Sequence, residues 1–309
     1  PRLTWLDLTG GEIFVRPDAE QIFEAVAAAT PALTVLHFPT NGWFGDRVVD
    51  VATRFRQARP GVDVIITVSV DRALRTFRAL QDAGVTAYVG TTLTADSEPH
   101  LDALHETLQK AIPGFDDRLW HWNWLQRSEQ FFKNDDAYPA LVPPRHRERL
   151  REHVARRGAP RSFVDVMELG FLLNLERYLD GEPTGVGCQS LRSTCFISPE
   201  GDLYPCHVWD RPLGNVVDTP FADLWAAHAT LEARRQVERL DCGGCFTPCE
   251  AYPALAGSPV AAAAGTIRGA VRHLAARRGI PPSSGAADLR ADGPAAARTA
   301  HPDAAVTRG

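Results

Sequence analysis

All six cysteines of this 309-residue chain lie between residues 188 and 249. Thiols confined to so short a stretch form a local site, and they cannot be a disulfide framework that holds the whole chain together. They fall into two groups, Cys188-x6-Cys195-x10-Cys206 and Cys242-x2-Cys245-x3-Cys249. Thiolates are soft ligands that suit zinc or iron–sulfur clusters, so the sequence predicts a metal centre in this part of the chain.

The residues around the thiols indicate how they could meet. Cys188 and Cys206 flank a predicted hairpin whose turn is Pro-Glu-Gly-Asp at 199–202, and Cys242 and Cys245 can chelate from one tight turn. Four thiolates satisfy either a structural zinc ion or a [4Fe–4S] cluster, and spacing alone leaves both open. A disulfide is the weaker alternative, because clustered cysteines in a reducing compartment favour metal.

Composition and length set broad limits. A net charge of -5 argues against a nucleic-acid binder, which would normally carry a basic patch. The sequence has no apolar run long enough for a membrane span and no charged-then-apolar leader, so we expect a cytoplasmic protein. The length suits one large or two modest domains.

The first half of the chain alternates short apolar runs with amphipathic stretches. Strands are predicted at 3–8, 33–38, 62–70, 85–93 and 119–125, with helices between them, one of them capped by Asp46. Such alternation is typical of parallel βαβ units. We therefore expect an α/β fold, a partial (β/α) barrel, whose active site would lie at the carboxyl ends of the strands.

The predicted domain organisation has four parts. The partial barrel spans 1–143, a helical connection spans 144–187, a cysteine-rich module spans 188–257, and a tail spans 258–309. In the connection, Ser162 and Asp165 resemble a capping pair that opens a helix. The module should contain one helix from Thr219 to about Leu240. The tail should begin with a helix over 261–278 and end in a disordered stretch over 281–309, which has almost no large apolar residue.

A tryptophan-rich segment, Trp-His-Trp-Asn-Trp-Leu-Gln at 120–126, ends the predicted barrel. In a strand, alternate residues share a face, so His121 and Asn123 would lie on one face and the three tryptophans on the other. Two interpretations remain open. His121 and Asn123 could face a substrate inside the barrel, or the segment could be a packing seam whose polar groups are satisfied internally.

Several motifs in the cysteine region resemble a known family. Twelve residues separate Cys188 from Gly201, and four more lead to Cys206; Leu-Gly-Asn at 213–215, Phe-Ala-Asp-Leu-Trp at 221–225 and the final cysteines follow in order. This series resembles the SPASM or twitch module of radical S-adenosylmethionine (radical SAM) enzymes, which holds one or two auxiliary [4Fe–4S] clusters. The resemblance and the six cysteines favour one cluster, bound by Cys188, Cys206, Cys242 and Cys245, with Cys195 or Cys249 as alternates.

Three motifs of the barrel half resemble the same family. Gly10-Gly11-Glu12 matches a motif that binds the amino group of S-adenosylmethionine, and Thr-Asn-Gly at 40–42 matches a second motif. Ser69 and Asp71 match positions that hold the ribose and carboxylate. Each motif lies at the carboxyl end of a predicted strand. The resemblance covers roughly residues 3–257 and implies that Gly10, Gly11, Glu12, Asn41, Ser69 and Asp71 bind S-adenosylmethionine.

The chain departs from the family in two places. The CxxxCxxC loop that binds the catalytic cluster is absent from the sequence, which suggests either a truncated enzyme or a degenerate relative. The loop after Asp71 is also shorter than in relatives. The resemblance implies hydrogen abstraction by a 5′-deoxyadenosyl radical from a peptide or small-molecule substrate, with a reductant such as flavodoxin or ferredoxin. The alternative is a non-catalytic scaffold that binds zinc or an iron–sulfur cluster.

Overall fold

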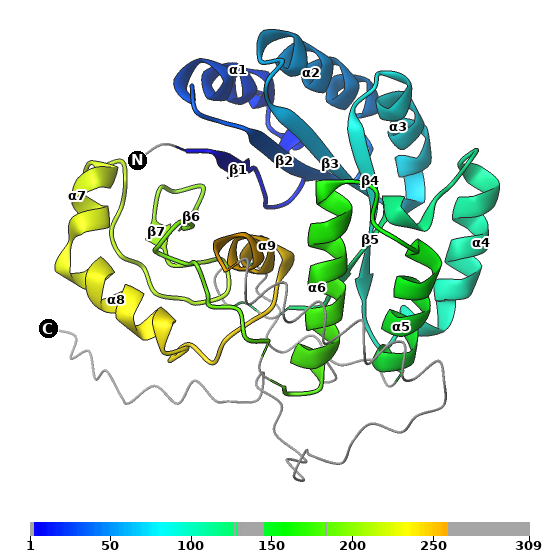
Figure 1. The fold of residues 1–309 in the computed structure, drawn as a ribbon. Helices are drawn as coiled ribbons and strands as arrows, with labels where there is room; N and C mark the ends of the chain where they lie inside the picture. Colours follow the sequence, from blue (N-terminus) through cyan, green and yellow to red (C-terminus); the bar gives the residue numbers. More distant parts are fainter. Residues whose placement is uncertain (1–2, 127, 129–130, 132–144, 183, 259–309) are drawn as a thin grey trace, which may run out of the picture. The chain divides into compact units, whose positions relative to one another are not determined.

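The computed structural model describes residues 3–126, 128, 131, 145–182 and 184–258, except for the side chains of residues 69–73. The chain forms two compact units (Figure 1). Unit 1 comprises Pro1–Arg127 and Phe131–Glu168, and unit 2 comprises Ser128–Gln130 and Leu169–Gly309.

Unit 1 contains a parallel sheet of five strands that lie in chain order, as expected for βαβ units. The strands are β1 (Trp5–Asp7), β2 (Val35–Thr40), β3 (Asp63–Ser69), β4 (Thr86–Leu93) and β5 (Trp120–Trp124). The helices that connect them are α1 (Ala19–Ala29), α2 (Gly45–Ala58), α3 (Val70–Asp82) and α4 (Leu101–Ala111), with short 3-10 turns η1 (Ile13–Val15), η2 (Glu98–His100) and η3 (Asp117–Leu119). These four helices line one side of the sheet (Figure 1), and the α/β prediction is confirmed.

The two faces of this sheet differ in chemistry. The face toward the helices is apolar and buried, and it includes Leu36, Phe38, Ile66, Val68, Val89, Trp120, Trp122 and Trp124. Alternate residues point the other way, so the opposite face carries polar side chains, among them His37, Thr67, Tyr88, His121 and Asn123. The three tryptophans are buried on the side that faces the helices, as either interpretation of this segment requires.

Two helices occupy the predicted helical connection, α5 (His146–Arg157) and α6 (Phe163–Leu179). Helix α6 begins with the expected capping pair: the Asp165 backbone N–H donates to Ser162 Oγ at 3.1 Å, and the Ser162 N–H donates to Asp165 Oδ2 at 3.0 Å. The predicted cap of α2 is wrong, because this helix begins at Gly45 and Asp46 lies in its first turn.

Unit 2 contains the hairpin β6 (Phe196–Ile197) and β7 (Leu203–Tyr204), and helices α7 (Phe221–Ala226), α8 (His228–Glu238) and α9 (Pro248–Gly257). The antiparallel pair confirms the predicted hairpin. The single helix predicted from Thr219 to Leu240 is wrong, because the backbone of Ala227 is extended (φ −61°, ψ 148°) and separates α7 from α8. The expected helix at 261–278 and disordered tail at 281–309 lie outside the described residues.

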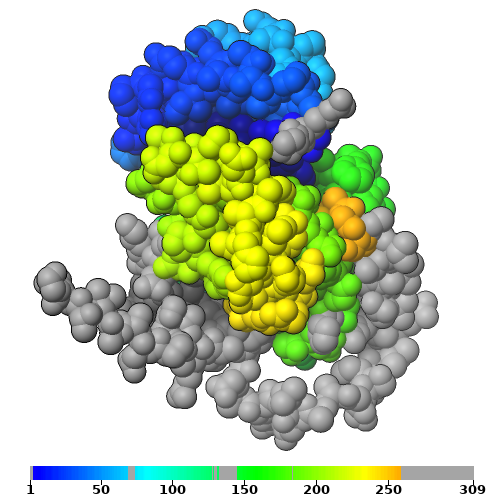
Figure 2. Space-filling model, turned by 90° about the vertical axis from the view of Figure 1, so that its left-hand side faces the viewer, coloured from blue at the N-terminus to red at the C-terminus, as the bar shows by residue number. Residues whose placement is uncertain are grey.

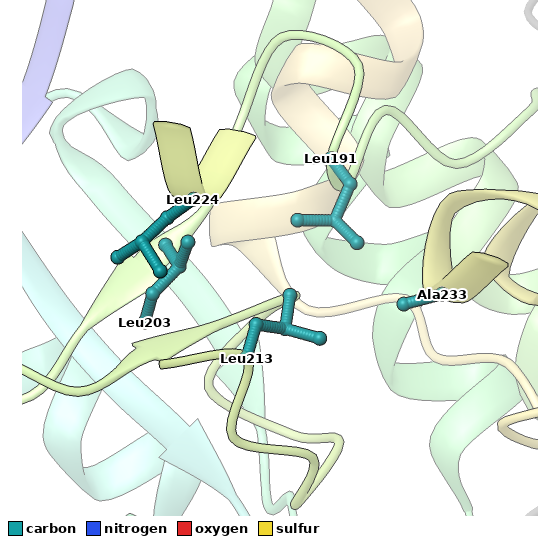
Figure 3. Close-up of a cluster of buried hydrophobic side chains, with 5 residues drawn as sticks. All are labelled: Leu191, Leu203, Leu213, Leu224 and Ala233. Carbon is teal, nitrogen blue, oxygen red and sulfur yellow. The ribbon is translucent and has the colours of Figure 1, made fainter. Parts of the chain in front are cut away.

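A small apolar core supports unit 2. It consists of Leu191, Leu203, Leu213, Leu224 and Ala233 (Figure 3). Helices α7 and α8 lie at the surface (yellow in Figure 2). No described helix has both the length and the apolar composition that a membrane crossing requires.

Candidate functional site

The Gly-Gly-Glu and Thr-Asn-Gly motifs meet at the carboxyl ends of β1 and β2. Glu12 Oε2 accepts hydrogen bonds from Thr40 Oγ1 at 2.8 Å and from the Asn41 backbone N–H at 2.7 Å. Glu12 Oε1 accepts from the Phe14 N–H at 3.2 Å and so caps the turn η1. The carboxylate therefore joins two loops that lie 28 residues apart in the chain.

The glycines of the first motif leave the backbone open. A Cβ placed on Gly10 or Gly11 would meet no atom within 4 Å. Because neither residue has a side chain, a ligand can approach the peptide groups closely. Ser69 and Asp71, the other predicted cofactor residues, lie where β3 passes into α3, and their side chains fall outside the described part of the structure.

His121 has a partner that sequence reasoning missed. Its Nδ1 lies 3.0 Å and 3.1 Å from the two carboxylate oxygens of Glu168, on α6. Glu168 is buried. The only signal in the sequence is one glutamate within an apolar helical run. Asn123 uses its side-chain oxygen locally and accepts from the Trp124 N–H at 2.7 Å. Nearby, burial and the charges of Asp165 and Glu168 raise the pKa of Tyr88 to about 12.

A second polar chain crosses the same face over three strands. His37 Nδ1 lies 2.9 Å from Asp7 Oδ1, and His37 Nε2 lies 3.0 Å from Thr67 Oγ1. With Nδ1–H donating to Asp7, Nε2 is left to accept the Thr67 hydroxyl proton. Both ring nitrogens of His37 are thus satisfied within the sheet.

In unit 2, the surroundings of the thiols disfavour the negatively charged thiolate form. Burial raises the pKa of Cys188 to about 12, and it also raises the pKa values of Cys206, Cys242 and Cys245. Proximity contributes as well, because Cys188 and Cys206 each interact electrostatically with both Cys242 and Cys245. Four thiolates placed so would repel one another unless a cation balanced them.

Backbone N–H groups point at the same four sulfurs. Cys188 Sγ accepts from the Ser190 N–H at 3.5 Å, and Cys206 Sγ accepts from the Trp209 N–H at 3.3 Å. Cys242 receives the N–H of Gly244. Cys245 receives that of Thr247. Such N–H donors stabilise thiolates and are a known means of tuning iron–sulfur clusters.

The remaining two cysteines differ. Cys195 packs against the apolar core of unit 2, and its pKa is raised to about 11 by burial and by Glu250, with no other cysteine contributing. Cys249 is exposed. Within the described residues, no three His, Cys, Asp or Glu side chains converge closely enough for one metal ion. A [4Fe–4S] cluster is larger than an ion, and its four cysteines enclose more space.

Glu250, on α9, is a further group that the sequence did not indicate. Burial raises its pKa to about 8, and Thr194 Oγ1 donates to its Oε2 at 3.4 Å. Its charge contributes to raising the pKa values of Cys195 and of the four thiols. A buried carboxyl is therefore part of the surroundings of the thiols.

The Leu-Gly-Asn motif has a structural role in the hairpin. Asn215 Nδ2 donates to the Glu200 backbone oxygen at 2.9 Å and to Asp202 Oδ1 at 3.0 Å. Its Oδ1 accepts from the Val217 N–H at 2.8 Å. Gly201, in this turn, has a φ of 93°, a left-handed conformation that favours glycine. The turn between Cys195 and Cys206 is thus held by the motif that follows it.

Comparison with known proteins agrees with this geometry. Residues 188–246 match the SPASM family, described as an iron–sulfur cluster-binding domain. No curated protein matches the chain. Among solved structures, native anSMEcpe with bound AdoMet and Cp18Cys peptide has a TM-score of 0.52 at 13% identity, covering 91% of this chain and 87% of that chain. The same protein with Kp18Cys peptide has a TM-score of 0.49 at 14% identity, covering 89% and 86%.

These neighbours are structures of an anaerobic sulfatase-maturating enzyme, a radical SAM protein with a SPASM domain. At such low identity, the likeness shows the fold alone. The chain therefore shares the fold of the neighbour with the TM-score of 0.52, and residues 188–246 match the SPASM domain.

Proposed function

Because residues 188–246 match the SPASM iron–sulfur cluster-binding domain, we propose that the chain is a radical SAM enzyme that uses S-adenosylmethionine and [4Fe–4S] clusters to abstract a hydrogen atom from its substrate. One observation carries the proposal: four buried or partly buried thiols, each with a backbone N–H donor, gather in that domain. The cofactors supply the radical chemistry, while the protein binds, orients and shields the reacting groups.

The auxiliary cluster would be held by Cys188, Cys206, Cys242 and Cys245. Their mutual electrostatic coupling and their N–H donors support this set. Cys249 is exposed, and Cys195 packs against the apolar core of unit 2. The donor set also fits the group chemically, because thiolate ligands at a buried site suit iron–sulfur clusters.

S-adenosylmethionine would bind at the carboxyl ends of the strands in unit 1. The open backbone at Gly10 and Gly11 supports this assignment, as does the junction of their loop with Asn41. Ser69 and Asp71 would complete the site at the end of β3. The catalytic cluster would require a CxxxCxxC segment, which the printed sequence does not contain.

We propose a peptide substrate, since solved structures of the same fold hold peptides beside AdoMet. His121, held by Glu168 on the polar face of the sheet, would face this substrate together with Asn123. A small flavodoxin or ferredoxin would supply electrons, and the enzyme would be cytoplasmic.

The decisive experiment is anaerobic reconstitution with iron and sulfide, followed by a count of both per chain. One [4Fe–4S] cluster gives about four of each. The Cys206→Ser variant should lose the cluster, and the matched variant Cys195→Ala should keep it. Stoichiometric zinc without sulfide would favour the second candidate, a non-catalytic zinc scaffold.

A further inference from the structure

We propose that Glu12 and Arg47 are positioning residues that fasten the two candidate cofactor loops to each other, and that Glu12 does not itself bind the ammonium group of S-adenosylmethionine. The inference rests on the proposed function, because it concerns how the same edge of the sheet receives its cofactor. Here the Gly-Gly-Glu loop means residues 8–16. The Thr-Asn-Gly loop means residues 40–47, which include the last residue of β2 and the first residues of helix α2, Arg47 among them.

The Glu12 carboxylate is largely used within the protein. Its two oxygens accept three hydrogen bonds, from Thr40 Oγ1 at 2.8 Å, Asn41 N at 2.7 Å and Phe14 N at 3.2 Å. A carboxylate offers about four acceptor sites. Three of these sites are occupied, so Glu12 could accept at most one of the three donors of an ammonium group without losing a bond that holds the loops.

Arg47 makes the reciprocal connection, from the Thr-Asn-Gly loop to the other. Its Nη1 donates to the Phe14 backbone oxygen at 2.7 Å. Its Nε and Nη2 form a two-point contact with Glu20, both at 2.8 Å. The guanidinium also lies 5.7 Å from the ring centroids of Phe14 and Phe44. Each loop thus contributes one charged side chain that hydrogen-bonds to the other loop.

The Thr-Asn-Gly loop is also bonded internally. The Gly42 N–H donates to Thr40 Oγ1 at 3.1 Å, and the Trp43 N–H donates to Asn41 Oδ1 at 2.9 Å. Thr76 Oγ1, on α3, donates to the Gly42 oxygen at 3.0 Å. With the Asn41 N–H bound to Glu12, three consecutive amides are already paired. A ligand would therefore use the open backbone at 10–11 and the exposed side of Asn41.

Two ligands distinguish fastening from direct binding. S-adenosylmethionine has the ammonium group, and its deamino analogue, which has hydrogen in place of the amino group and keeps the carboxylate and the sulfonium, lacks only that group. If Glu12 fastens the loops, Glu12→Gln should weaken both ligands by the same factor, about tenfold for a loss near 1.4 kcal/mol. Thr40→Val, which removes the hydroxyl that Glu12 accepts from, should act in the same way, and Thr40→Ser should restore binding. A loss confined to S-adenosylmethionine would overturn the proposal.

A second readout needs no ligand. Hydrogen exchange at the Asn41 amide should speed up in Glu12→Gln, because this N–H donates to the carboxylate. Arg47→Lys should loosen residues 40–47 too, because an ammonium group lacks the guanidinium fork. The control Glu24→Gln, which alters an exposed pair with Arg54, should change neither. Unchanged exchange at Asn41 would refute the fastening role. If neither ligand binds the wild-type chain, the proposed function fails, while the exchange result still decides the role of Glu12.

Discussion

The two units prepare their sites in opposite ways. In unit 1, the polar groups of the candidate cofactor edge are paired before any ligand arrives, as with Glu12 and His37. In unit 2, four thiols with raised pKa values lie near one another, so their charged forms would repel one another unless a bound cation balanced them. The difference teaches that unit 1 can hold its shape alone, while metal binding and folding should be coupled in unit 2.

The largest expected effect follows from removing one buried thiol. Cys206→Ser should reduce bound iron from about four per chain to less than one, because a hydroxyl does not replace a thiolate ligand. Cys195→Ala should retain the wild-type count, since Cys195 packs against the apolar core. Iron and sulfide analysis after anaerobic reconstitution measures both. Equal losses in the two variants would contradict the ligand set.

Removal of the metal should destabilise unit 2 and leave unit 1 stable. After chelation, amides in residues 188–257 should lose most of their protection from hydrogen exchange, while strands β2–β4 keep theirs. Exchange monitored by mass spectrometry, before and after chelation, gives both values in one sample. Equal loss in the two units would break the comparison, because it would mean that unit 1 also depends on the metal.

A pair of glycines tests how tightly each unit is packed. In unit 2, Gly214 has a φ of 128°, and a Cβ there would lie 2.5 Å from Leu224 Cδ2. Gly214→Ala should therefore lower the free energy of unfolding by about 3 kcal/mol, from backbone strain and overpacking together. Leu224→Val should restore only part of it, since the strain remains. Full restoration in a urea titration would disprove the backbone contribution.

In unit 1, only the space around Gly90 opposes a larger side chain at that position. A Cβ on Gly90 would lie 2.5 Å from Thr67 Cγ2, and its backbone needs no left-handed conformation. Gly90→Ala should cost about 2 kcal/mol. Thr67→Ser removes the methyl group and keeps the hydroxyl that bonds to His37, so it should restore stability in the double variant. An additive double variant would show that the two residues do not compete for space.

The smallest effect concerns acid pH in unit 1. A hydrogen bond from Arg47 is the main cause that lowers the pKa of Glu20 to about 2, from a usual value of 4.5. A lowered pKa stabilises the fold above the unfolded value, so this contribution is lost as the pH falls from 4.5 towards 2. Glu20→Gln should flatten the pH dependence of stability in that window only. Unfolding curves measured at several pH values test this, and a pH dependence unchanged by Glu20→Gln would contradict it.

Periodicity and spacing predicted the local features of both units. The parallel strand order, the hairpin before Cys206 and the capping pair at Ser162 each depend on residues close in sequence. The break at Ala227 was missed, because no proline or glycine interrupts residues 221–238. Pattern analysis could not distinguish two helices from one.

The partners that complete the sites lay beyond such reasoning. Glu168 meets His121 from 47 residues away, and Arg47 reaches Phe14 across 33 residues. Glu250 lies among the thiols because α9 folds beside them. None of these contacts leaves a period or a spacing in the chain, so only the tertiary structure identifies them. The sequence could name the groups that carry chemistry, but it could not name those that hold them.

Because backbone groups donate the hydrogen bonds to sulfur, the side chains at the donor positions can vary. At Ser190, Trp209 and Thr247 the donor is the peptide N–H, which every residue except proline provides. These positions can change their side chains over evolution without losing the bond to the thiol. Substitution of proline at one of these positions would remove the N–H donor and keep every cysteine. Such a variant is therefore a way to shift the reduction potential of a bound cluster.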